Sequence, residues 1–258
     1  MRMTSLLATA IIMIAPATFA MAKDEGLAKA VAAPHRAPAM VERDKARKPQ
    51  EVLEFFGIKP TMTVVEVSPG GGYWTEILAP YLKGKGTYYA TVGQRSDAFR
   101  KKLAADPAAY GDVKLVEVTP GAAIGPAGSA DLVLTFRNVH NWMSNGTADQ
   151  MFEAFFKSLK PGGVLGIEEH RASNSQPQDP KAANGYVRED YTIQLAEKAG
   201  FKLLGKSEIL ANPKDTKDYP EGVWTLPPTL AMGDKDRAKY VAIGESDNFL
   251  LKFQKPQK

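Results

Sequence analysis

The stretch TVVEVSPGGGYWTEILA, residues 63–79, combines a strand pattern, a glycine turn and a helix pattern. Its three valines are β-branched and apolar, which favours a buried strand. Residues 68–72 cannot continue that strand, because consecutive glycines favour a turn and let another molecule approach the backbone closely. From Tyr73 onward, apolar side chains recur at helical spacing as far as Pro80. This order is typical of the opening of a nucleotide-binding α/β unit, since the N–H groups at the start of the helix can bind a ligand.

An acidic residue, Glu66, interrupts the apolar strand. An unpaired carboxylate inside such a strand is energetically costly, so Glu66 needs a local partner. The N–H groups of the neighbouring loop are the donors that we expect. A glycine turn can also be purely structural, so the motif by itself leaves both interpretations open.

Residues 1–22 have the pattern of a secretory signal peptide. Arg2 supplies the positive charge, residues 6–15 are apolar, and cleavage is expected after Ala22, or alternatively after Ala20. The apolar run is shorter than the roughly 20 residues that a membrane-spanning helix requires. We therefore expect export, with a mature protein that is periplasmic or secreted.

The composition excludes several kinds of function. The 258 residues include no cysteine, which excludes disulfide bonds, thiolate metal sites and a cysteine nucleophile. The formal net charge of +4 is spread along the chain, so nothing in it indicates nucleic-acid binding. After the leader, no stretch is apolar enough to span a bilayer, so we expect no integral membrane segment. Nothing in the composition indicates an oligomeric state.

Strand and helix patterns alternate along the rest of the chain. Strands are expected at residues 63–67, 87–92, 113–118, 131–136, 164–167, 201–210 and 247–254, and helices at residues 40–48, 50–56, 73–82, 96–104, 150–159 and 189–199. This alternation predicts an α/β domain with a Rossmann-like, doubly wound, mostly parallel sheet. The last two strands are joined without a helical crossover, which predicts an antiparallel edge strand. Residues 23–56 are expected to form a helical lead-in, and residues 57–258 the α/β domain.

Three segments that carry polar or glycine residues come directly after expected strands. They are the glycine turn, residues 137–142 (RNVHNW) and residues 168–171 (EEHR). In doubly wound sheets, ligands bind beyond the carboxyl ends of the strands, so we expect these segments to converge. His140 and His170 are the candidate catalytic residues, because an imidazole can take up a proton near neutral pH.

Each histidine also has alternative interpretations. His140 can be hydrogen-bonded for a structural reason, and His170 can belong to an ion-pair corner of neighbouring glutamates with Arg171. The two histidines with Glu169 could form a metal site, since histidine and carboxylate are suitable zinc ligands. No close sequence spacing supports such a site, so we assign no metal.

Several motifs resemble those of class I S-adenosylmethionine-dependent methyltransferases. Residues 66–72 (EVSPGGG) resemble the first motif of that family, residues 131–134 (DLVL) its fourth-strand motif, and residues 159–165 (LKPGGVL) its turn into the fifth strand. The resemblance implies S-adenosylmethionine as the cofactor. The cofactor-binding residues that we expect are Glu66, Ser68, Pro69, Gly70, Gly71, Gly72, Tyr73, Gln94 and Asn138.

The mature chain is also similar, over nearly its whole length, to a bacterial group of exported, predicted methyltransferases. The similar pieces are Arg43-Asp44-x-x-Arg47-x-Pro49, Pro69-Gly70-Gly71-Gly72-Tyr73, Arg137-Asn138-x-His140-Asn141-Trp142, Glu169-His170-Arg171, Arg188-Glu189-Asp190-Tyr191 and Gly244-Glu245-Ser246-Asp247. A charged stretch such as residues 40–48 is ordinarily a solvated face. The resemblance instead implies that Arg43 and Arg47 belong to a pocket.

The chain departs from the family pattern at three places. Val92 stands where family members usually have an acidic residue that binds the ribose hydroxyls, and Gln94 could hydrogen-bond them instead. Thr119 stands where an acidic residue near the adenine is common, and Ser68 replaces the first glycine of the first motif.

We therefore expect an S-adenosylmethionine-dependent methyltransferase that acts on an unidentified small molecule in the cell envelope. The glycine turn and Glu66 would hold the donor, His140 and His170 would orient or deprotonate the acceptor, and Asn138 or Trp142 would line its pocket. Residues 172–185 would form a mobile lid. The alternative is a non-catalytic module that keeps the fold and binds a small ligand, which the residues at positions 92 and 119 favour.

Overall fold

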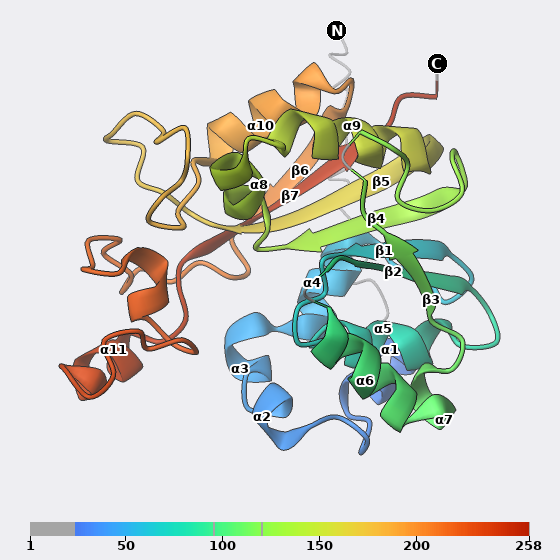
Figure 1. The fold of residues 1–258 in the computed structure, drawn as a ribbon, viewed down its shortest axis with the longest axis horizontal. Helices are drawn as coiled ribbons and strands as arrows, with labels where there is room; N and C mark the ends of the chain where they lie inside the picture. Colours follow the sequence, from blue (N-terminus) through green and yellow to red (C-terminus); the bar gives the residue numbers. More distant parts are fainter. Residues whose placement is uncertain (1–23, 95, 120, 258) are drawn as a thin grey trace, which may run out of the picture.

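The computed structural model describes residues 24–94, 96–119 and 121–257, which form a seven-stranded sheet (Figure 1). The strand order is β3-β2-β1-β4-β5-β7-β6. The strands are β1 (Thr63–Val67), β2 (Thr87–Val92), β3 (Lys114–Glu117), β4 (Ala130–Phe136), β5 (Leu159–His170), β6 (Lys202–Ser207) and β7 (Asn248–Gln254). β7 is antiparallel to both of its neighbours, β5 and β6, and the other paired strands are parallel. The prediction of a doubly wound, mostly parallel α/β sheet with an antiparallel edge is confirmed.

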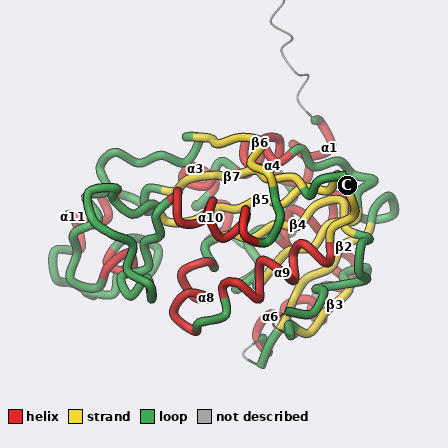
Figure 2. The backbone as a smooth tube through the Cα atoms, turned by 90° about the horizontal axis from the view of Figure 1, so that it is seen from above, coloured by secondary structure: helices red, strands yellow, loops and turns green. Residues whose placement is uncertain are grey.

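Helices cover both faces of the sheet (Figure 1). They are α1 (Glu25–Val31), α2 (Pro38–Val41), α3 (Asp44–Arg47), α4 (Pro49–Phe56), α5 (Thr75–Leu82), α6 (Asp97–Ala105), α7 (Pro107–Tyr110), α8 (Val139–Asn145), α9 (Ala148–Ser158), α10 (Glu189–Lys198), α11 (Arg237–Ile243) and the short 3₁₀ helix η1 (Gly222–Thr225). One core cluster holds apolar side chains of α1, α4, α5 and α6, and the other holds those of α8, α9 and α10. The central strands are apolar on both faces because both faces are covered. α11 and its adjoining loops project beyond one end of the sheet (Figure 2).

Residues 24–56 pack into the core of the domain. Leu27 of α1 and Phe56 of α4 are fully buried in the same cluster as Ile77 of α5. Phe56 lies directly against Gly166 of β5, where an added Cβ atom would be only 2.7 Å from its ring. The missing side chain at position 166 therefore lets α4 lie close to the sheet. Residues 1–23, which include the predicted signal peptide, lie outside the described residues.

Two segments differ from the sequence-based expectation. The helix expected at residues 40–48 is instead the pair α2 and α3, which ends before Pro49. Lys48 has a left-handed conformation (φ +41°), because a residue before proline is disfavoured in the α-helical region. The polar segment after β4 also contains a helix that was not predicted, since α8 begins at Val139.

The segment predicted as a lid, residues 172–185, is hydrogen-bonded near its amino end to a residue that follows it. The guanidinium group of Arg188 donates hydrogen bonds to the backbone oxygens of Asn174 (3.2 Å) and Gln176 (2.7 Å). Tyr186 is buried, and its hydroxyl donates to the carboxylate of Asp215 (3.0 Å). Within the described ranges, no helix is long and apolar enough to cross a membrane.

Candidate functional site

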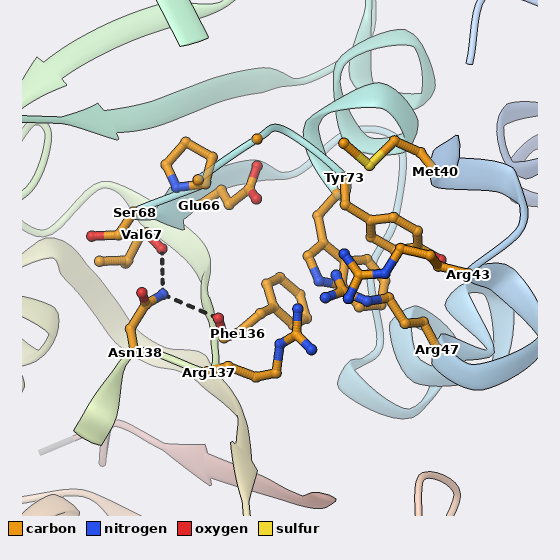
Figure 3. Close-up of a pocket in the computed structure, with 14 residues that line it drawn as sticks. Met40, Arg43, Arg47, Glu66, Val67, Ser68, Tyr73, Phe136, Arg137 and Asn138 are labelled. Carbon is orange, nitrogen blue, oxygen red and sulfur yellow. Dashed lines mark hydrogen bonds between the residues drawn. The ribbon is translucent and has the colours of Figure 1, made fainter. Parts of the chain in front are cut away.

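A cavity of about 230 Å³ lies at the carboxyl ends of β1 and β4 (Figure 3). These two strands are neighbours in the sheet although β2 and β3 follow β1 in the sequence, so the cavity lies where the strand order reverses. We call it the first cavity. Its lining residues are Met40, Arg43, Arg47, Glu66, Val67, Ser68, Pro69, Gly70, Gly71, Tyr73, Trp74, Phe136, Arg137 and Asn138. The lead-in therefore supplies one wall, and the glycine turn and the end of β4 supply the others.

The structure brings most of the predicted cofactor-binding residues together. Glu66, Ser68, Pro69, Gly70, Gly71, Tyr73 and Asn138 all line the first cavity, whereas Gly72 and Gln94 do not. Gly72 faces α6, since a Cβ atom there would lie 3.2 Å from the ring of Phe99. Gln94 is exposed beyond the end of β2, and Val92 is buried. The lining includes no residue of β2 or β3, where a ribose and an adenine would be expected.

The glycine turn presents backbone N–H groups to the first cavity. Within the described part of the chain, the N–H groups of Gly70 and Gly71 donate to no protein acceptor. A Cβ atom at Gly70 would meet nothing within 4 Å, so the backbone there is open to a ligand. The N–H group of Ser68, in contrast, donates to the hydroxyl of Thr91 (2.8 Å) and is not free for a ligand.

Two non-glycine residues at this edge of the sheet have left-handed backbones. Ser68 follows β1 with φ +52°, and Arg137 follows β4 with φ +60°. Ser68 thus occupies the conformation that the first glycine of the motif would adopt easily. Such conformations cost non-glycine residues about 1–2 kcal/mol and are concentrated at functional sites. Asn138 connects the two strand ends, because its amide nitrogen donates to the backbone oxygens of Val67 (3.1 Å) and Phe136 (3.2 Å) (Figure 3).

Glu66 is completely buried, but its partners are not the loop amides that we expected. One carboxylate oxygen, Oε2, accepts hydrogen bonds from the hydroxyls of Thr75 (2.7 Å) and Tyr88. The partners are instead the hydroxyls of α5 and β2, and the N–H groups of Gly70 and Gly71 are not bonded to Glu66. Burial raises the pKa of Glu66 to about 7. The other oxygen, Oε1, is buried and has no hydrogen-bond partner among the described residues, so it remains available to a ligand.

Three arginines surround one carboxylate beside the first cavity. Arg43 forms two hydrogen bonds with Glu245 (2.7 and 2.8 Å), Arg137 forms one (3.0 Å), and Nε of Arg47 lies 3.5 Å from it. The three guanidinium groups share this single carboxylate, so the site carries an excess of positive charge. Arg47 is only 4% exposed, and its Nε and Nη2 atoms make no hydrogen bond within the described residues. Arg43 and Arg47 therefore line a pocket, as the resemblance implied, and do not form a solvated face.

Aromatic side chains form the floor of the first cavity. The indole ring of Trp74 is stacked on Phe136, with ring centroids 4.1 Å apart. The guanidinium of Arg47 lies 4.4 Å from the centroid of Tyr73, in a cation–π contact. The hydroxyl of Tyr73 donates to Asp44 (2.6 Å) and fixes the lead-in against the glycine turn. A flat, electron-rich surface beside a positive rim can hold a ligand that has both apolar and anionic parts.

A second cavity, of about 190 Å³, lies on the other side of Arg137. Its lining residues are Arg137, His140, His170, Val223, Trp224, Pro227, Pro228, Thr229 and Ser246. Arg137 therefore lines both cavities. A wider groove of about 760 Å³ adjoins both, sharing Arg43 and Arg47 with the first cavity and Pro227 with the second.

The two candidate histidines lie side by side in the wall of the second cavity, with ring centroids 5.4 Å apart. His140 comes from α8, and its Nδ1 atom is 3.0 Å from Oε1 of Glu169. His170 ends β5, and its Nδ1 atom is 2.9 Å from Oδ1 of Asn248. Arg171 contacts neither Glu168 nor Glu169, since its ion pairs are with Glu189, Glu208 and Asp247. The ion-pair corner that the sequence suggested around His170 is therefore not formed.

The buried groups around the second cavity have pKa values that are shifted in different directions. Burial lowers the pKa of His170 to about 3, so its imidazole is neutral at physiological pH. Burial alone would raise the pKa of Glu169, but the neighbouring histidines and hydrogen bonds outweigh it, and the pKa is lowered. Burial raises the pKa of Glu168 to about 7. A charged Glu169 beside His140 is the arrangement that orients a histidine as a proton acceptor.

Some residues of the site were not predicted, and Trp142 does not lie where it was predicted. Trp142 does not line the second cavity, because it packs against Phe155 in the core. Trp224 and Pro228 do line it, although nothing in their sequence neighbourhood indicated this. Glu245 belonged to a motif of the resemblance, but its contacts with three arginines join residues that are between 108 and 202 positions apart.

The fold is shared with enzymes of known structure. No model of a protein family matches the sequence, and no curated protein matches it. An S-adenosylmethionine-dependent methyltransferase from Aquifex aeolicus is 18% identical with a TM-score of 0.58, over 85% of this chain and 94% of that chain. Phosphoethanolamine N-methyltransferase 2 of Haemonchus contortus, in complex with S-adenosylmethionine, is 13% identical with a TM-score of 0.56, over 90% of this chain and 60% of that chain. The chain therefore has the class I methyltransferase fold.

The same fold also occurs in a protein named for another reaction. The [4+2]-cyclase SpnF is 16% identical, with a TM-score of 0.60, and the likeness covers 91% of this chain and 93% of that chain. The reaction of this chain has to be argued from its own site, because a shared fold does not fix a function.

Replacing Glu66 with glutamine should change how stability depends on pH. The folded protein keeps the Glu66 proton up to about pH 7, whereas the unfolded chain releases it near pH 4.5. The contribution of the Glu66 carboxyl to the free energy of unfolding therefore falls as the pH rises from 4.5 to 7. The Glu66→Gln variant has no ionisable group at this position, so its stability does not fall for this reason. Between pH 4.5 and pH 8, the free energy of unfolding of the variant should rise relative to wild type by up to about 3 kcal/mol. Urea denaturation at several pH values measures it.

The matched control for this prediction is Glu51→Gln, at an exposed position of α4. It should leave the pH dependence unchanged. Parallel pH profiles for wild type and Glu66→Gln would show that the Glu66 carboxylate has an ordinary pKa.

Proposed function

We propose that this protein is an S-adenosylmethionine-dependent methyltransferase that acts on a small molecule. The observation that carries the proposal is the pair of cavities joined at Arg137, one beside a glycine turn and the other beside two histidines. Methyl transfer is an in-line displacement, so a donor and an acceptor have to meet across one boundary. The class I methyltransferase fold of the chain supports this interpretation.

The first cavity suits the amino-acid end of the donor. The free N–H groups of Gly70 and Gly71 and the unsatisfied guanidinium atoms of Arg47 can bind a carboxylate. Oε1 of Glu66 can accept a hydrogen bond from the donor's ammonium group. The adenosine would extend over the end of β2 toward Gln94.

The second cavity suits the acceptor. His140 is oriented by Glu169 and can take the proton of a hydroxyl or ammonium group as the methyl group is transferred. His170 is neutral and can accept or position a hydrogen bond beside it. The ring of Trp224, in edge contact with His140, gives the acceptor an apolar wall.

A second candidate function is binding of a small ligand without transfer. Val92 is buried at the end of β2, so no carboxylate there can bind ribose hydroxyls. A protein that binds the donor's product, or a related nucleoside, but transfers no methyl group would have this function.

Replacing Arg47 with methionine should weaken binding of S-adenosylmethionine. Methionine keeps part of the apolar contact with Tyr73 but removes the charge-assisted hydrogen bonds, which are worth about 1.5–3 kcal/mol. The dissociation constant measured by calorimetry should rise about 10- to 100-fold. Arg100→Met is the control, since Arg100 pairs with Glu117 on the surface. Absence of binding to the wild type at millimolar donor would contradict the proposed methyl transfer.

Replacing His140 with alanine should abolish methyl transfer while S-adenosylmethionine still binds. The loss should be on the order of 10²- to 10⁴-fold, as for removal of a general base. The assay follows labelled methyl groups from the donor into small molecules of a cell-envelope extract. His35→Ala is the control, because His35 contacts the backbone of Glu76 and lines neither cavity. Transfer that persists at the wild-type rate would remove His140 from the reaction, and donor binding without any transfer would favour the second candidate.

We also propose that the protein acts in the cell envelope, in the periplasm or after secretion. The support is the sequence of residues 1–22 alone. Fractionation of cells with mass spectrometry of the amino terminus tests it, and a full-length chain in the cytoplasm would contradict it.

A further inference from the structure

We propose that His140 and His170 bind a divalent transition-metal ion through their Nε2 atoms, at the wall of the second cavity. One potential ligand atom from each of His140, Glu169 and His170 lies within 4.8 Å of the others, and all three residues are buried. The two histidines come from different elements, α8 and β5, which the fold brings together. This inference goes beyond the proposed function and does not depend on it. With an ion on Nε2 of His140, whose Nδ1 atom carries a proton, a water bound to the ion would take up the acceptor's proton in place of His140.

The hydrogen bonds of the two rings leave the right atoms free. Nδ1 of His140 contacts the carboxylate of Glu169, which can only accept, so this nitrogen carries the proton. The amide nitrogen of Asn248 donates to Glu168 (2.8 Å), so the amide oxygen of Asn248 faces Nδ1 of His170. The hydroxyl of Ser246 is 2.7 Å from Nδ1 of His170 and donates its proton to the same amide oxygen (2.9 Å), so it can only accept from Nδ1. Both rings are therefore held in the tautomer with a lone pair on Nε2. Neither Nε2 atom has a hydrogen-bond partner among the residues that the structure describes.

This arrangement is the one that surrounds metal-bound histidines. A histidine ligand almost always donates its other ring N–H to a carboxylate or an amide or backbone oxygen, which fixes the ring and raises its basicity. Here Glu169 accepts the hydrogen bond from Nδ1 of His140, and Asn248 accepts one from Nδ1 of His170. A cation beside the rings would also offset the buried charge of Glu169. The guanidinium of Arg137 lines the same cavity and would repel a metal ion. Its ion pair with Glu245 reduces that repulsion.

The number and type of ligands indicate the kind of ion. Two imidazoles suit zinc, copper, cobalt, nickel or iron(II), and not magnesium or calcium, which prefer oxygen ligands. Ligand atoms of a tetrahedral zinc ion lie about 3.3 Å apart, so the two rings have to rotate toward a shared ion when it binds. The remaining coordination positions would face the cavity and admit water or an oxygen of the acceptor. Open positions of this kind distinguish reactive metal sites from structural ones.

Titration of the full-length mature protein with Zn²⁺ and Co²⁺ tests the inference, using a chain without a polyhistidine tag. We expect a single ion to bind, and Co²⁺ to give a visible absorption spectrum of nitrogen coordination. His140→Ala and His170→Ala should each weaken binding on the order of 100-fold or more, and Glu169→Gln by about 10- to 100-fold. His35→Ala should bind as wild type does, since the chain has 3 histidines and only His35 lies away from the site.

Several outcomes would overturn the inference. These are an absence of binding by the folded wild type, a Co²⁺ spectrum of oxygen ligands only, or equal binding by wild type and the His140 and His170 variants. Circular dichroism of each variant without metal establishes that the variant is folded. The Co²⁺ absorption spectrum of the wild type tests the inference even if a variant fails to fold. Binding of S-adenosylmethionine is measured separately, on metal-free protein. If no metal binds, the proposed methyltransferase function is therefore still tested by that measurement.

Discussion

The carboxylate of Glu245 is the contact around which the site is assembled. It pairs with Arg43 and Arg47 from the lead-in and with Arg137 from the end of β4, and these three segments are distant in the sequence. Like charges at this distance repel, so three guanidinium groups can share this space only while a carboxylate lies among them. The first cavity, the second cavity and the wider groove all border this cluster. Glu245 therefore sets both the shape of the site and its positive potential.

The fold and the first cavity could be predicted from local sequence. Valine-rich strands, the glycine turn and the apolar helix after it are local signals, and each determines structure within a few residues. Because the carboxyl ends of parallel strands share one edge, the positions of residues 68–72, 137–142 and 168–171 in the chain were enough to expect their convergence. His140 and His170 are neighbours in the structure for this reason.

The parts that could not be predicted depend on contacts that leave no local pattern. The hydroxyl partners of Glu66 come from α5 and β2, and only the packed sheet brings Thr75 and Tyr88 to it. The wall formed by Trp224 lies in a loop-rich segment whose position no periodicity defines. The pocket position of Arg47 was implied by the resemblance but not by the local pattern, because a charged helical stretch is usually solvated; the ring of Tyr73 and the distant Glu245 explain its burial.

The position of β7 between β5 and β6 has a consequence for biosynthesis. The approach to β7 delivers Glu245 to arginines about 200 residues earlier in the chain. At translation rates of roughly 5–20 residues per second, Arg43 leaves the ribosome about 10–40 s before its partner exists. During that interval the lead-in arginines have no carboxylate to hold them, and the glycine loop has no complete wall. The ligand site is consequently one of the final features to form. A nascent chain in which β7 has not yet been synthesised has an incomplete first cavity and cannot retain a ligand there.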